Sequence, residues 1–265
     1  MSTFFEKIND LDILLHCDGY EREYFFAECS RLAYKGQKLA SKEFKKVGFT
    51  SYKFCSVEGA QCHIVKNRDY IVIAFRGTEP RQFSDIKADL MAWKRKSRTE
   101  GHVHAGFKNE LDKLWADIKM GLSRKGDRTI FLCGHSLGGA IATVCASRLE
   151  KDVEELYTYG SPRVGGDVFR DNLLVDHCRV VNNNDMVAKV PFWFMGYRHH
   201  GYLTYINHYG NIRELTSWQK LKDQIRGRWC ALRKFQMFDG IRDHDINKYC
   251  KKLKGLVKIE PTFGD

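Results

Sequence analysis

The chain has 265 residues, 43% of them hydrophobic, and this size and composition suit a single α/β domain over 1–265 with a sizeable core. No run of about 18 apolar residues is present, which excludes a membrane-spanning helix. The formal net charge of +11 indicates either a surface that attracts anionic membranes, nucleic acid or acidic partners, or a solvated basic face with no specific partner. Zinc-finger spacings and RNP-like aromatic motifs are missing, so no nucleic-acid partner is predicted.

Helical and strand patterns alternate along most of the chain. Strands that alternate with helices predict an α/β fold with a mostly parallel central sheet and helices on both of its faces. In chain order the predicted elements are a helix over 20–34, strands over 61–66 and 70–75, a helix over 105–122, a strand over 129–133, a helix from about 140, a strand over 155–159, a helix over 167–175, a strand over 179–182, a hairpin over 203–215 and a basic helical C-terminal part from about 217.

A Gly-x-Ser-x-Gly pattern joins the strand at 129–133 to the next helix. In Gly134-His135-Ser136-Leu137-Gly138, the two glycines suit a tight turn at which a side chain would collide with a neighbouring strand or helix. Such a turn lifts the Ser136 hydroxyl above the sheet edge and aims the first helical amides, beginning with Leu137, at a reacting oxygen. The pattern is typical of the nucleophile elbow of an α/β-hydrolase.

A serine nucleophile needs a base, and the base needs an acid that orients it. In this fold the acid follows a strand end after the elbow. Asp185 fits, because it comes after a short apolar strand and a run of polar turn residues, and Pro191 ends the segment. The alternatives, Asp167, Asp171 and Asp176, fall in a helical pattern that is more typical of surface charges.

The base is expected to be a histidine that follows Asp185 in the chain. The candidates are His199, His200, His208 and His244. His244 follows a loop and begins a helical pattern, which suits a catalytic histidine, but spacing alone places it only modestly ahead of the others.

The second oxyanion donor is expected in the loop that follows an earlier strand. The strand at 70–75 is followed by Arg76-Gly77-Thr78, where Gly77 permits a close backbone approach. The Thr78 amide, with its hydroxyl, would then point at the developing negative charge. Arg76 is expected to have a structural role.

Taken together, these segments resemble the class 3 lipases, the family of fungal triacylglycerol lipases and plant lipase-like proteins. The resemblance spans about residues 71–249. Its motifs, in chain order, are Ala-Phe-Arg-Gly-Thr at 74–78, Ala-Asp-Leu at 88–90, Val-His-Ala-Gly-Phe at 103–107, Gly-His-Ser-Leu-Gly-Gly at 134–139, Tyr-Gly-Ser-Pro-Arg-Val-Gly at 159–165, Asn-Asn-Asp-Met-Val at 183–187, Tyr-Arg-His-His-Gly at 197–201 and Asp-His-Asp-Ile-Asn-Lys-Tyr at 243–249.

The resemblance implies a role for each matching residue. The nucleophile falls on Ser136, the acid on Asp185 and the base on His244, with Thr78 and the Leu137 amide in the oxyanion hole. It also implies that His199 is structural, and that His104 and His135 are scaffold residues beside the site. Four residues are taken as candidates for substrate binding: Phe83, His104, Phe192 and Trp193.

Two segments depart from the secreted lipases of this family. The loop after Thr78, where those lipases carry an amphipathic lid helix, has only Phe83 and Ile86 as apolar residues over 79–86. The aromatic loop at 191–197 directly follows the acid, and three roles are open to it: lining an acyl pocket, touching lipid or packing in the core. Interfacial activation by a lid is not predicted, because the loop over 79–86 has too few apolar residues for an amphipathic lid helix.

The sequence thus predicts a serine carboxylic-ester hydrolase that cleaves acylglycerols or phospholipids through an acyl-enzyme on Ser136, with no metal or organic cofactor. The alternatives are a phospholipase A-type enzyme on anionic membranes and a non-catalytic lipase-like binding protein. The basic surface favours peripheral contact with an anionic membrane. A cytoplasmic location is expected, because the start of the chain lacks a signal-peptide pattern and the nine scattered cysteines fit no disulfide framework.

Overall fold

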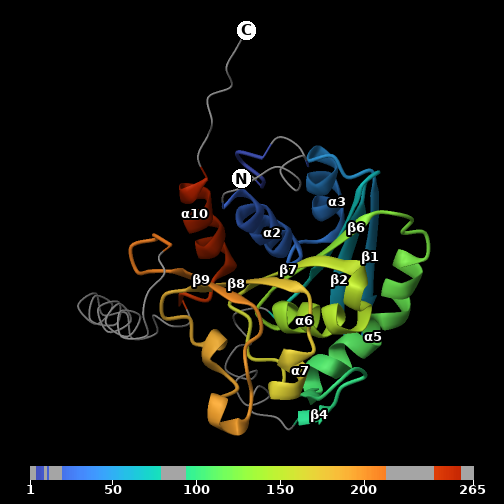
Figure 1. Cartoon of the computed structure of the whole chain (residues 1–265). Helices are drawn as coiled ribbons and strands as arrows, with labels where there is room; N and C mark the ends of the chain where they lie inside the picture. The colour runs from blue at the N-terminus through green and yellow to red at the C-terminus, as the bar shows by residue number, and fades with distance from the viewer. Residues whose placement is uncertain (1–3, 9–10, 12–19, 79–93, 213–241, 258–265) are drawn as a thin grey trace.

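A computed structural model describes residues 4–8, 11, 20–78, 94–212 and 242–257 of the chain (Figure 1). Its centre is a seven-stranded sheet in the order β1-β2-β3-β6-β7-β8-β9, and the five strands from β3 to β9 run parallel. The first two pairs, β1 with β2 and β2 with β3, are antiparallel. The strands are β1 (Ser51–Val57), β2 (Ala60–Lys66), β3 (Tyr70–Phe75), β6 (Thr129–His135), β7 (Val153–Tyr159), β8 (Asp176–Asn182) and β9 (Tyr202–Ile206).

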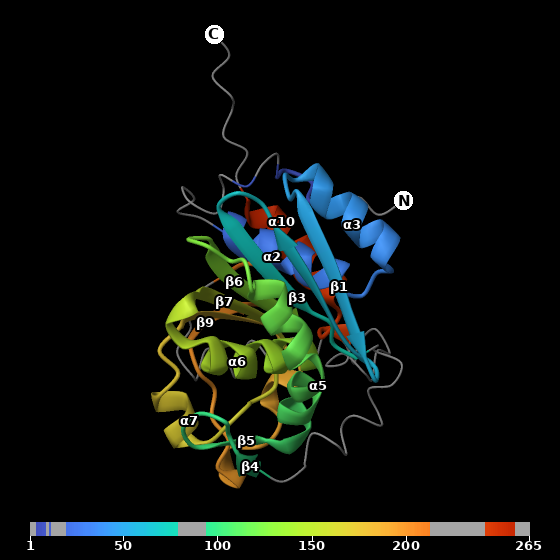
Figure 2. The same ribbon diagram turned by 90° about the vertical axis from the view of Figure 1, so that its right-hand side faces the viewer.

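Helices cover both faces of this sheet, as predicted (Figure 2). A separate two-stranded ribbon, β4 (Lys94–Lys96) with β5 (His102–His104), and short 3₁₀ turns complete the described fold. The helices are α2 (Glu21–Leu32), α3 (Gln37–Lys46), α5 (Ala105–Leu122), α6 (Leu137–Leu149), α7 (Asp167–Asp171) and α10 (Ile246–Leu256).

Successive strand residues point to opposite faces of the sheet, and this alternation builds two cores. Phe131, Cys133 and Tyr157 belong to the core under α2 and α10. Their chain neighbours Ile130 and Leu132 belong to the core under α5 and α6. Near-continuous apolar strands are what a sheet covered on both faces requires.

The predicted helix over 105–122 matches α5, and the predicted strands lie within β2, β3, β6, β7, β8 and β9. The helix predicted over 167–175 ends early, at Asp171, because the chain must turn there to enter β8. Of the second arm of the predicted hairpin, only Ile212 lies within the described residues, where it forms an isolated bridge with Ile206. The region from 213 to 241, with the start of the basic C-terminal part, lies outside the described residues.

The cysteines of the described residues are buried thiols and form no disulfide: Cys29, Cys55, Cys62, Cys133, Cys145, Cys178 and Cys250. None of the described helices combines the length and the apolar character that crossing a bilayer would demand.

Candidate active site

Ser136 lies at the carboxyl edge of the sheet, in the sharp turn between β6 and α6. Its backbone has φ +60°, a conformation that non-glycine residues adopt rarely and that is typical of functional turns. A side chain at Gly134 would collide with the main chain of Gly138, and one at Gly138 would collide with Phe75 and Arg76. Both glycines are therefore needed for the elbow.

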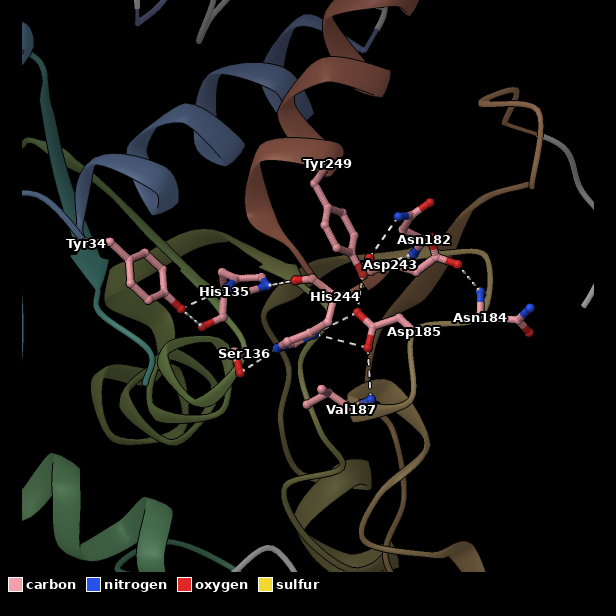
Figure 3. A network of polar contacts seen from close by, with 10 residues as sticks. All are labelled: Tyr34, His135, Ser136, Asn182, Asn184, Asp185, Val187, Asp243, His244 and Tyr249. Atoms are coloured by element: carbon pink, nitrogen blue, oxygen red, sulfur yellow. Dashed lines mark hydrogen bonds and ion pairs between the residues drawn. The ribbon is translucent and has the colours of Figure 1, made fainter. Parts of the chain in front are cut away.

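The structure brings Ser136, His244 and Asp185 together in one hydrogen-bonded row (Figure 3). His244 Nε2 lies 2.8 Å from Ser136 Oγ, and His244 Nδ1 lies 2.9 Å from Asp185 Oδ2. Because a carboxylate only accepts, Nδ1 carries the proton and donates it, which leaves Nε2 to accept from the serine hydroxyl. All three side chains are buried. This is the arrangement in which a serine can be activated as a nucleophile.

Asp185 is held by donors from three segments. Besides His244, the backbone N–H of Val187 donates to Oδ1 at 2.9 Å, and the Tyr249 hydroxyl donates to Oδ2 at 2.5 Å. Burial and the nearby Asp185 carboxylate raise the pKa of Tyr249 well above its usual value, so its hydroxyl keeps its proton. Gly160, with φ +55°, makes room for this cluster, because a Cβ there would lie 2.9 Å from His244 Nδ1. Sequence reasoning gave neither Tyr249 nor Gly160 a role.

Asp243 stabilises the turn that carries Asp185 through three hydrogen bonds. Its carboxylate accepts from Asn183 Nδ2 at 2.9 Å and from the Asn184 backbone N–H at 3.3 Å. Its main-chain oxygen accepts from Asn182 Nδ2 at 2.8 Å. Asp243, which precedes the candidate base, therefore accepts hydrogen bonds from all three residues that precede the candidate acid. The Asn-Asn-Asn run at 182–184, interpreted from sequence only as turn residues, supplies these donors.

His135 links the elbow to the main chain of His244. His135 Nε2 donates to the His244 carbonyl at 2.6 Å, and the Tyr34 hydroxyl lies 2.8 Å from Nδ1. Burial lowers the pKa of His135 well below its usual value, so the ring is neutral and Nδ1 accepts from Tyr34. The expectation that His135 stands beside the site as a scaffold residue agrees with these contacts.

Thr78 and Leu137, the predicted oxyanion-hole residues, lie on two segments that meet at the elbow. Leu137 is the first residue of α6, and Thr78 follows the Phe75–Gly77 segment against which Gly138 packs. Amides at a helix N-terminus lack partners within the helix and suit a developing oxyanion. Arg76, expected to be structural, donates from Nη1 to Gln61 Oε1 at 2.7 Å.

The four candidate substrate-binding residues are found in different settings. His104 is buried, stacks on Phe107 with the ring centres 4.1 Å apart, and accepts from the Gly106 N–H as the N-cap of α5. Phe192 and Trp193 lie on a short exposed loop, with 38% and 66% of their surfaces exposed. Phe83 lies outside the described residues.

The other histidines and carboxylates considered for the site are placed apart from Ser136. His199 Nε2 donates to the Ala188 carbonyl at 2.8 Å, and His200 Nδ1 lies 3.1 Å from His177 Nδ1. Asp167 and Asp171 form ion pairs with Arg170 on α7. Asp176 is exposed at the start of β8, and His208 follows β9.

Replacing Tyr249 by phenylalanine is expected to lower kcat about tenfold, because Asp185 loses one of its three donors and holds the His244 ring less firmly. The weaker contact is also expected to move the acidic limb of the pH–rate profile, a change that simple loss of stability does not produce. Steady-state kinetics across pH, with the exposed Tyr209→Phe as control, would measure both effects. Unchanged kcat and profile would show that this hydroxyl has no positioning role.

With this geometry in place, comparison with known proteins identifies relatives for part of the chain. The family model described as "Lipase (class 3)" matches residues 72–195. The secreted mono- and diacylglycerol lipase 1 of Fusarium solani is 42% identical over 106 residues, which is 37% of this chain and 32% of that protein. Toxin TseL of Vibrio cholerae is 29% identical over 184 residues, 52% of this chain and 28% of the toxin. The chain spans about a third of the length of the first curated relatives that it matches.

Solved structures share the fold. A Rhizomucor miehei lipase in complex with its propeptide superimposes with a TM-score of 0.64 at 18% identity, covering 85% of this chain and 77% of that one. A lipase from Rhizopus microsporus var. chinensis gives a TM-score of 0.58 at 24% identity, covering 70% of this chain and 74% of that one. The prediction of an α/β-hydrolase fold with a mostly parallel central sheet is confirmed.

The comparison contradicts the cytoplasmic location expected from the sequence. The relatives from Fusarium solani, Malassezia globosa and Penicillium cyclopium are named secreted lipases. The expectation was wrong because it rested on scattered cysteines and on the start of the chain. The described cysteines are packed as small apolar residues in the core, and such packing does not determine a compartment.

Proposed function

Because residues 72–195 place this chain in the class 3 lipase family, we propose that it is a serine carboxylic-ester hydrolase that cleaves lipid esters through an acyl-enzyme on Ser136. The observation that carries the proposal is the row Ser136–His244–Asp185, with its two contacts of 2.8 and 2.9 Å. No metal or organic cofactor takes part in this reaction.

Acylation begins at the Ser136 hydroxyl. His244 Nε2 takes its proton as Oγ attacks the ester carbonyl carbon, and Asp185 stabilises the imidazolium that forms. The carbonyl oxygen becomes negative and is stabilised by amides at Leu137 and Thr78. The tetrahedral intermediate collapses when His244 returns the proton to the leaving alcohol, and the acyl group stays on Ser136.

Deacylation runs the same steps with water. His244 Nε2 removes a proton from a water molecule that attacks the acyl carbon, and the same amides stabilise the second oxyanion. The proton then returns to Ser136 Oγ, which leaves the fatty acid as product. Tyr249 and Val187 keep Asp185 oriented through both half-reactions.

The proposed substrates are glycerolipids, either acylglycerols or phospholipids. Acylglycerols are supported by the names of the relatives, several of which are mono- and diacylglycerol lipases. Phospholipids on an anionic membrane, the phospholipase A-type alternative, are supported by the net charge of +11.

Hydrolysis of a chain-length series of p-nitrophenyl esters, run beside diolein, triolein and phosphatidylglycerol, tests this function. We expect turnover that rises with acyl-chain length and selects one lipid class. Absence of turnover on every ester would contradict the enzyme and favour a lipase-shaped binding protein, which would bind the same lipids without cleaving them.

The loop after the acid supports a second part of the proposal, contact with a lipid surface. The aromatic surface loop consists of Phe192, Trp193 and Phe194. Their surfaces are 38%, 66% and 68% exposed, respectively. The Phe192 and Phe194 rings stack on each other 5.2 Å apart. Exposed aromatic groups in one patch are typical of interaction sites, and Trp favours the interfacial region of a bilayer.

A short cationic strand lies beside the aromatic surface loop. Lys94 donates to the Gly196 carbonyl at 3.0 Å, which sets β4 beside the loop (Figure 2). Arg95 and Lys96 on β4 are exposed. Each Lys or Arg near an anionic bilayer adds about 1 kcal/mol of attraction. The aromatic surface loop with β4 therefore suits an anionic membrane that delivers the lipid substrate.

Replacing both Trp193 and Phe194 by alanine is expected to weaken binding to phosphatidylglycerol vesicles by roughly 10- to 100-fold, because two exposed rings that would enter the bilayer interface are lost. Vesicle sedimentation would measure this loss, with Met120→Ala as control because Met120 on α5 is 63% exposed. Equal binding by all variants would contradict a membrane role. If the double variant instead kept its vesicle binding and showed a higher KM for soluble esters, the rings would belong to an acyl pocket.

A further inference from the structure

A small cavity lies on the α6–α7 side of β8, away from Ser136. Its volume is about 10 Å³, enough for one particle about the size of a water molecule. It is lined by Thr143, Ser161, Pro162, Val164, Gly165, Phe169, Arg170, His177, Arg179, Arg198, His199 and His200. Arginine and histidine make up half of this set, and no carboxylate belongs to it.

Two of the three lining arginines have their charges matched outside the cavity. Arg170 forms ion pairs with Asp167 at 3.0 Å and Asp171 at 2.8 Å, and Arg198 pairs with Asp167 at 3.0 Å. The charges of Arg170 and Arg198 are therefore balanced by carboxylates of α7.

Arg179 differs from them. It projects from the middle of β8, and its buried Nε has no hydrogen-bond partner among the described residues. The residues opposite it are Thr158 on β7 and Leu203 on β9, which carry no charge. Burial and the nearby Arg163 lower the pKa of Arg179 to about 10, so it remains a cation at neutral pH. A buried N–H of a guanidinium that has no acceptor is costly until an acceptor arrives.

The histidines around the cavity do not supply that acceptor. His177 lies between Thr158 Oγ1 at 2.8 Å and His200 Nδ1 at 3.1 Å, and His199 donates to the Ala188 carbonyl. Burial lowers the pKa values of His177 and His199 well below their usual range, so both rings are neutral. Arg179 is thus the one lining cation of the cavity whose charge no described ion pair matches.

We propose that this cavity binds one small monovalent inorganic anion of the halide class, held by Arg179 Nε. A phosphate or carboxylate ligand is too large for a cavity of about 10 Å³, and water would leave the guanidinium charge unmatched.

The site is joined to the turn that carries Asp185. Arg163, which neighbours Arg179, binds the carbonyl oxygens of Lys189 and Pro191. His199 on the cavity wall binds that of Ala188. The bound anion offsets the repulsion between Arg163 and Arg179 and so stabilises the 188–191 segment that follows the candidate acid.

The test compares halides with a non-binding anion at constant ionic strength. Protein in sodium gluconate is titrated with chloride or bromide, and the midpoint of thermal unfolding is followed. We expect a saturable rise of about 2–4 °C once the halide exceeds its Kd severalfold. Arg179→Gln is expected to abolish this rise. Lys125→Gln, which removes the same charge from an exposed pair with Asp152, is expected to keep it.

Crystals soaked in bromide give a second readout, independent of ester hydrolysis. An anomalous peak within hydrogen-bond distance of Arg179 Nε supports the proposal, and it decides alone if Arg179→Gln does not fold. A water molecule at this place in bromide overturns the proposal. An equal thermal response of Arg179→Gln and the wild type also overturns it, because the effect is then general charge screening.

Discussion

Replacing Ser136 by alanine is expected to lower kcat for ester hydrolysis by roughly 10⁴-fold or more, the largest effect of any single change in this chain. The hydroxyl that His244 Nε2 faces at 2.8 Å would be absent, so no acyl-enzyme could form. A small residual rate is expected, because the oxyanion hole proposed at Leu137 and Thr78 would remain. The assay is turnover of the best p-nitrophenyl ester, with the thermal midpoint measured in parallel.

Ser147 offers a matched control for this substitution. It lies on the same helix, α6, is buried, and donates from Oγ to the Val144 carbonyl at 2.8 Å. Ser147→Ala removes the same atom from a structural contact, and its kcat should stay within about twofold of the wild type. If Ser136→Ala retained the wild-type rate on every ester, the acyl-enzyme mechanism would be wrong.

Replacing Asp185 by asparagine is expected to lower kcat about 10⁴-fold while the fold is retained. The amide is nearly the same size, but its NH₂ group cannot accept the proton of His244 Nδ1. Tyr249 and Val187 already donate to the two carboxylate oxygens, so an NH₂ group at either position meets a donor. The ring of His244 is then driven to the wrong tautomer, and Nε2 no longer accepts from Ser136.

Asp117→Asn is the control for this change, because it removes one half-buried carboxylate that pairs with Lys53 on α5. Kinetics and near-ultraviolet circular dichroism should be measured on both variants. A rate for Asp185→Asn within tenfold of the wild type would show that another carboxylate orients His244.

Local patterns were sufficient to predict the parts of the molecule built from neighbouring residues. The apolar run before Ser136 and the small residues after it predicted a buried strand and a close-packed helix, found as β6 and α6. The polar turn after β8 led to Asp185 for a similar reason. His244 could not be separated from its rivals by spacing, and the resemblance to the family was needed to choose it.

Contacts between distant segments could not be predicted in this way. Tyr249 reaches Asp185 across 64 positions of sequence, and Asp243 reaches Asn183 across 60. Nothing in the residues around either partner signals such a pair, because it is created by the packing of α10 beside β8. β1 and α3 were also missed. β1 is half exposed and carries polar residues, so its apolar pattern is weak.

The chain of contacts from Tyr34 through His135 to His244 has a consequence for the minimal active fragment. The segment that matches the family model, 72–195, contains Ser136 and Asp185 but neither Tyr34 nor His244. A fragment trimmed to those limits would also lose α2 and α10, and Phe131 and Tyr157 would face water. The segment that matches the family model is therefore shorter than the unit that must fold. Expression trials should use a fragment that also includes α2 and α10.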